Sequence, residues 1–78
     1  MMNREDAYLY IKKEVDKVPS DTIFLLSDLF PGYIWKSISL ANRIWLGSTF
    51  LSKVQENEFT SIEILEKTSS NKQKYKKK

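Results

Sequence analysis

Apolar residues recur at helical spacing near the start of the chain. Those that fall on one side of a helix are Ala7, Tyr8, Ile11, Val15 and Val18. Asn3 is a suitable N-cap, the first turn carries Glu5 and Asp6, and Pro19 ends the pattern. The sequence therefore predicts a helix over 4–18 with one face in the core.

Shorter apolar segments follow the proline. The run 22–26 is apolar and partly β-branched, which predicts a brief strand covered on both faces. A short helical segment over 28–30 is then expected, because Ser27 and Asp28 can open it and Pro31-Gly32 interrupts it. Helix resumes over about 33–37.

The longest predicted helix spans roughly 39–55, with Ser37 or Ser39 as its N-cap. Its apolar arc at 100° per residue consists of Leu40, Ile44, Leu46, Gly47, Phe50, Leu51 and Val54. Gly47 lies on this arc, where close approach by another element is the usual reason for a glycine. Trp45 falls in the polar arc, so it is either exposed for stacking or covered by helix 4–18 or by the C-terminal strands.

The pattern changes to strand spacing after the acidic turn at 56–58. The segment 59–65 is strand-like, 69–71 is a turn, and Gln73, Lys74 and Tyr75 can form a returning strand. The order helix, short strand, two helices and C-terminal β-hairpin predicts an α+β fold of the winged helix-turn-helix type, with a lysine-rich C-terminal tail. We expect one domain over 1–67; residues 68–78 are either a disordered tail or the last strand of the wing.

Composition narrows the chemistry of this 78-residue chain, which has no Cys and no His. Thiolate metal sites, Cys nucleophiles and His acid–base catalysis are thereby excluded, and no paired carboxylates or Gly-rich phosphate loop assemble. We expect a non-enzymatic protein with no metal and no cofactor. Its longest apolar run is too short for a membrane span. Met1–Asp6 does not read as a signal peptide, so the predicted location is cytoplasmic.

Charge is distributed unevenly along the chain. Residues 29–55 contain three cations and no acid, 56–66 contain four acids and no base, and 67–78 contain six lysines and no acid. Cations beside aromatic rings are typical of single-stranded nucleic-acid binding, in which bases stack on rings and phosphates contact the cations. The candidate residues are Tyr33, Trp35, Lys36, Arg43, Trp45, Lys53, Lys72, Lys74, Tyr75 and Lys76.

Residues 20–78 also resemble a known family. The Asp28-Leu29-Phe30-Pro31 stretch, followed by Trp35, Arg43, Leu46-Gly47, Phe50 and Val54 and a Lys/Asn/Gln/Tyr-rich end, is similar to small proteins of staphylococcal cassette chromosomes and related mobile elements, long catalogued as a domain of unknown function. The resemblance implies a winged helix-turn-helix that binds single-stranded DNA and supports replication or repair of the element. It implies an apolar pocket formed by Phe30, Trp35, Leu46 and Phe50, with Arg43 at its rim.

Two other functions fit the same sequence features. Most winged helices are duplex-binding transcriptional regulators, but helix 39–55 offers few strong donors for reading base edges, and Trp45 would hinder docking in a major groove. The third hypothesis is an adaptor whose apolar groove holds a partner peptide. The lysine-rich tail could also dock a replication protein.

Overall fold

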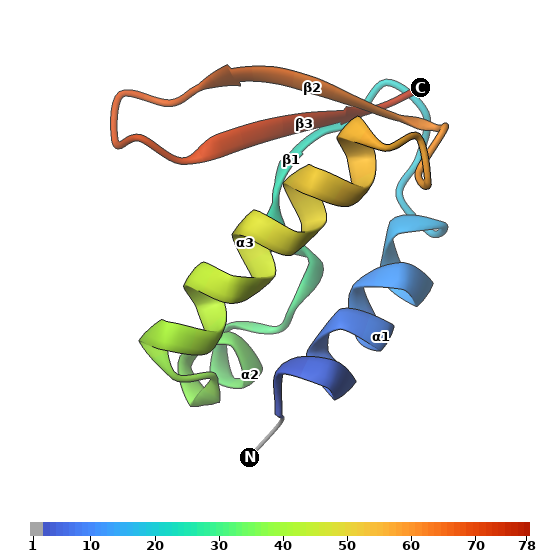
Figure 1. Ribbon diagram of the computed structural model, residues 1–78. Helices are drawn as coiled ribbons and strands as arrows, with labels where there is room; N and C mark the ends of the chain where they lie inside the picture. The colour runs from blue at the N-terminus through green and yellow to red at the C-terminus, as the bar shows by residue number, and fades with distance from the viewer. Residues whose placement is uncertain (1–2) are drawn as a thin grey trace.

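The computed structural model describes residues 3–78 and shows three helices, one 3₁₀ helix and a three-stranded sheet. Met1 and Met2, the first residues of the segment considered for a signal peptide, lie outside the described residues. The element order confirms the predicted α+β class and gives a winged-helix-like fold. In Figure 1 the sheet lies across the C-terminal end of α3, α1 lies along one side of that helix, and α2 lies beside its N-terminal end.

Helix α1 (Arg4–Val15) begins as the sequence predicts and ends three residues earlier. Asn3 Oδ1 accepts a hydrogen bond from the Asp6 amide at 2.8 Å. The predicted end at Val18 was wrong because Val18 precedes Pro19, and the residue before a proline is disfavoured in helical conformation. Residues 16–18 form a turn instead, and the buried side chains Ala7, Ile11 and Val15 pack toward α3.

Strand β1 (Ile23–Leu25) leads directly into the 3₁₀ helix η1 (Leu26–Leu29), where Asp28 Oδ2 accepts from the Leu25 amide at 2.9 Å. The expectation that both faces of this strand are covered was wrong, since Ile23 is 58% exposed. Helix α2 (Gly32–Ser37) follows Pro31, and helix α3 (Leu40–Gln55) begins after Ser39, whose hydroxyl accepts from the Asn42 amide.

The buried face of α3 consists of Leu46, Phe50 and Val54. Leu40 and Ile44 were predicted to share this face, but they are 69% and 63% exposed. The helix wheel joined two apolar stripes into one arc. Only the stripe centred on Phe50 is buried against the sheet and α1, because no other element of residues 3–78 covers Leu40 and Ile44.

The sheet order is β1-β3-β2, with every pair antiparallel. Strands β2 (Ile62–Lys67) and β3 (Gln73–Lys77) form the hairpin, so the lysine-rich end supplies the central strand of the sheet. Tyr75 lies opposite Phe24 of β1 and Ile64 of β2, and its ring is 4.8 Å from that of Phe50. Residues 68–78 were predicted to be either a disordered tail or the last strand of the wing, and the structure shows that they contain this strand.

Candidate nucleic-acid interface

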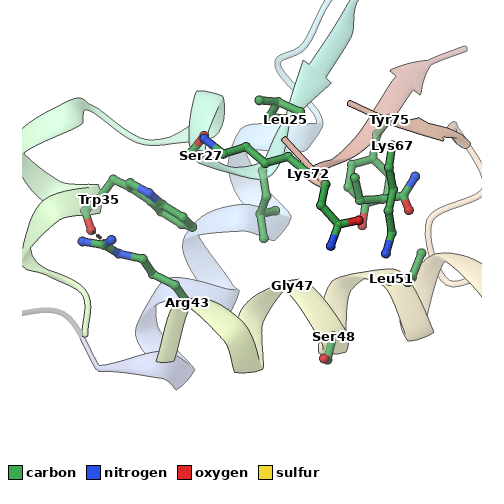
Figure 2. A pocket seen from close by; sticks show the side chains of 13 residues that line it. Leu25, Ser27, Trp35, Arg43, Gly47, Ser48, Leu51, Lys67, Lys72 and Tyr75 are labelled. Atoms are coloured by element: carbon green, nitrogen blue, oxygen red, sulfur yellow. Dashed lines mark hydrogen bonds between the residues drawn. The ribbon is translucent and has the colours of Figure 1, made fainter. Parts of the chain in front are cut away.

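A cavity of about 460 Å³ lies between α3 and the tip of the β2–β3 hairpin (Figure 2). One wall comes from α3, another from the hairpin, and the remainder from the η1 region and Trp35 of α2. Its lining residues are Leu25, Leu26, Ser27, Trp35, Arg43, Gly47, Ser48, Leu51, Lys67, Asn71, Lys72, Gln73 and Tyr75. The cavity combines apolar surface with three cationic side chains.

Arg43 joins α3 to the C-terminal end of α2. Its Nε donates to the Trp35 carbonyl oxygen at 3.2 Å, and Nη2 donates to that of Lys36 at 3.3 Å. Its guanidinium carbon also lies 5.5 Å from the Trp35 ring centroid. These contacts fit a cation at a helix C-terminus, where carbonyl groups have no intrahelical partner. Arg43 is therefore held at the cavity wall by backbone acceptors.

Trp35 is half-buried between this guanidinium and the core. Its ring centroid lies 5.4 Å from that of Phe30, which is buried, and Phe30 stacks in turn on Tyr10 of α1. The indole therefore packs against Phe30, which packs in turn on Tyr10, so the position of the Trp35 ring is fixed by buried aromatic contacts. Of the predicted aromatic residues, Trp35 and Tyr75 line the cavity, and the Trp35 ring lies there beside a predicted cation, Arg43.

Gly47 lies on the α3 wall and leaves it open. A Cβ built at this position would have no heavy atom outside its own helix segment within 4 Å. The expectation of a close backbone approach was therefore wrong. The face of α3 at Gly47 lines the cavity and does not pack on a neighbouring element.

The hairpin separates the predicted lysines into two groups. Lys72 lines the cavity, together with Lys67 from the other side of the turn, and Figure 2 shows the Lys72 side chain extending toward Ser27. Lys74 and Lys76 flank the buried Tyr75 on β3, so they point to the opposite face of the sheet. There they lie 3.8 Å from Glu66 and 3.9 Å from Asp21, respectively.

Several predicted site residues lie elsewhere. Phe30, Leu46 and Phe50 are core residues and do not line the cavity, so of the predicted apolar pocket only Trp35 is present there. Tyr75 does line the cavity, but it is 2% exposed, and its ring is therefore not open for stacking; burial raises the pKa of its hydroxyl to about 12. Tyr33 is 77% exposed and Lys36 is exposed, both on α2 outside the cavity lining.

Trp45 and Lys53 lie on the α1 side of α3. The Trp45 ring meets Tyr8 edge-on at 6.4 Å, and the Arg4 guanidinium carbon lies 4.9 Å from its centroid, so α1 half-buries it. Lys53 Nζ is 3.6 Å from a Glu58 carboxylate oxygen. Burial, followed by the nearby charge of Glu58, raises the pKa of Tyr8 in this cluster. Trp45 is thus neither a freely exposed platform nor a fully buried core residue.

Sequence reasoning missed Lys67 and Asn71 in the cavity. Thr68, Asn71 and Lys72 form the hairpin turn: Thr68 N donates to the Lys72 carbonyl oxygen, Thr68 Oγ1 accepts from Lys72 N, and Asn71 has a φ of 64°. Asn tolerates this left-handed conformation better than most residues. The turn signal at 69–71 contained the information, since it predicts that Lys67 lies opposite Gln73, next to Lys72, at the tip of the hairpin.

The comparison with family models places residues 10–77 in the family described as Domain of unknown function (DUF1413). The chain belongs to this family. The searches of curated proteins and of solved structures gave no match for the DUF1413 chain. In the described part of the chain, no helix of this DUF1413 protein is long and apolar enough to cross a membrane, and no group of three or more acidic residues forms a candidate metal site.

Proposed function

We propose that this DUF1413 protein binds single-stranded DNA without catalysing a reaction, using the cavity between α3 and the hairpin. The proposal is carried by the composition of this cavity: an indole and aliphatic side chains lie beside Arg43, Lys67 and Lys72. A single strand presents apolar base faces and a chain of phosphates, and proteins bind it with aromatic surfaces beside cations.

The exposed face of α3 argues against a duplex-binding regulator. In winged helices of that kind the equivalent helix enters the major groove and reads base edges with polar side chains. Here that face presents Leu40, Ala41, Ile44, Ser48 and Ser52, and Gln55 lies at its far end, as the last residue of the helix. A base-reading helix needs Arg, Lys, Asn or Gln at such positions, so duplex recognition is the weaker alternative.

A role in replication or repair of a mobile element is part of the same proposal and is supported by the sequence resemblance. That resemblance covers 20–78, which includes every residue of the cavity lining. Binding by stacking and phosphate contact is tolerant of sequence, as such a role requires.

The test is fluorescence polarisation with labelled oligo-dT and with a duplex of equal length, each at two salt concentrations. We expect oligo-dT to bind more tightly, with affinity falling as salt rises; each phosphate neutralised contributes about −0.7 to the log–log slope. Lys67→Gln with Lys72→Gln should weaken binding and make the slope shallower by roughly one to one and a half.

The matched control changes two exposed lysines on α1, Lys12→Gln with Lys13→Gln, which preserves the same net charge change away from the cavity. Equal losses in both double variants would indicate non-specific attraction to a basic protein. Duplex binding as tight as oligo-dT binding would favour a transcriptional regulator. If the protein binds no nucleic acid at low salt, the result would favour the third hypothesis, a peptide-binding adaptor.

A further inference from the structure

An apolar track runs along the exposed face of α3 and continues into the cavity. At about 100° per residue, Leu40, Ile44, Gly47 and Leu51 fall within roughly 60° of one another. Gly47 and Leu51 line the cavity, whereas Leu40 and Ile44 lie beyond it, 69% and 63% exposed. From Leu40 to Leu51 the track is about 17 Å long. Its exposed part, Leu40 and Ile44, is separate from the stripe of α3 that packs in the core, whereas Leu51 packs partly against that core.

Exposed aliphatic residues on a helix are unremarkable singly, but these two are adjacent at i and i+4 and contiguous with a cavity. Cations lie on one side of the track and at its cavity end. Arg43 lies beside it on the same helix, exposed Lys36 belongs to the end of α2 that Arg43 contacts, and Lys67 and Lys72 lie at the cavity end. Residues 29–55 contain no acid.

This charge decides between the possible occupants. A second copy of the chain packed on the track about a two-fold axis would bring like charges together, and such juxtaposition opposes association. A polyanion with apolar faces is complementary to both the aliphatic side chains and the cations. A single strand of nucleic acid has that chemistry, and its entry into the cavity is already proposed.

We infer that Leu40 and Ile44 extend the single-strand site beyond the cavity, so that the bound strand runs from the hairpin tip along α3 toward the α2–α3 turn. The bases contact the aliphatic track, while the phosphates lie near the flanking cations. This inference rests on the proposed function and adds two binding residues and a direction for the strand. It also explains why the exposed face of α3 carries the aliphatic residues Leu40 and Ile44, whereas the recognition helix of a duplex-binding protein carries polar residues on that face.

The test combines Leu40→Gln with Ile44→Gln and measures binding to an oligo-dT length series. Gln has good helix propensity, and both positions are exposed, so the melting temperature should stay close to that of the unmodified protein. For the longer oligonucleotides we expect affinity about tenfold weaker, about 1.4 kcal/mol. The affinity of the variant should also stop rising at a shorter length.

Leu9→Gln is the control, since Leu9 is 57% exposed on α1, and it should bind every length as the unmodified protein does.

Suppose that the unmodified protein binds oligo-dT through Lys67 and Lys72 but the Leu40/Ile44 variant matches it at every length. The track inference then fails and the proposed function stands. If the unmodified protein does not prefer oligo-dT over duplex, the proposed function itself fails. A variant that loses affinity for an acidic amphipathic peptide while retaining that for oligo-dT would assign the track to a protein partner and overturn the inference.

Discussion

The Nζ of Lys77 donates a hydrogen bond to the main-chain oxygen of Val15 at 2.8 Å, although 62 residues separate the two in sequence. Val15 is the last residue of α1, and its carbonyl oxygen also accepts from the Val18 amide at 3.3 Å. The lysine adds a second hydrogen bond to this carbonyl group and places its charge where the helix dipole favours a cation. A residue from the lysine-rich end thus ties the sheet to α1.

Replacing this lysine should destabilise the fold. Lys77→Met removes the hydrogen bond and the charge but keeps the aliphatic length, so we expect a loss of about 1 kcal/mol in the free energy of unfolding. Urea denaturation measures it. Lys78→Met, which changes an exposed terminal lysine, is the control and should be neutral. Equal stability of the two variants would show that the Lys77 contact contributes nothing.

Truncation after Lys67 should unfold the protein. The cut removes β3, the central strand, and with it Tyr75 from the core. Tyr75→Ala alone should cost about 3–5 kcal/mol, as other large aromatic-to-alanine changes in cores do. Circular dichroism of the truncated chain is the measurement. A cooperative thermal transition in it would contradict the central position of β3.

Gly47→Ala should stabilise α3. Helix propensity favours alanine by about 1 kcal/mol, and the added methyl group meets open space. This reverses the outcome expected from a close approach at this position. Gly47→Leu should also remain folded, but its side chain projects into the cavity and should weaken oligo-dT binding. Thermal unfolding and fluorescence polarisation separate the two effects, and a lowered melting temperature in Gly47→Ala would show that the cavity is closed in solution.

Trp45→Ala should lower stability without lowering single-strand affinity. The indole loses its contacts with Tyr8 and Arg4, and because it is half-buried we expect a cost of about 2 kcal/mol. Trp45 does not line the cavity, so binding by the folded fraction should be unchanged. Trp35→Ala is the comparison and should reduce both quantities. If Trp45→Ala binds oligo-dT poorly while remaining fully folded, the strand passes on the α1 side.

Stability should fall at alkaline pH. Burial raises the pKa of Tyr75 from its ordinary value of 10.0 to about 12, so the folded state retains a proton that the unfolded chain releases. The stabilisation is complete below pH 10 and is lost as pH rises toward 12, by about 2–3 kcal/mol. Urea titrations across this range measure the loss. Tyr75→Phe should show a smaller dependence in the same window, and an identical dependence would assign the effect to other groups.

The sequence alone determined the local structure and the order of the elements. Asn3 caps α1 as predicted, and Ser39 caps α3, one of the two serines predicted for that position. The turn at 69–71 and the strand patterns on either side of it produced a hairpin. These features depend on nearby residues: a cap bonds within its own first turn, and a tight turn fixes the pairing of its flanking strands. The α+β class followed from them.

Tertiary structure decided which surfaces are covered. Leu40 and Ile44 are as apolar as Leu46 and Val54, and a helix wheel places them on one arc; only the position of α1 and the sheet leaves the first pair exposed. The same packing directs Gly47 into a cavity, turns Lys74 and Lys76 away from Lys72, and buries Tyr75 within a lysine-rich segment. Burial depends on contacts between residues distant in sequence, and a local pattern does not specify them.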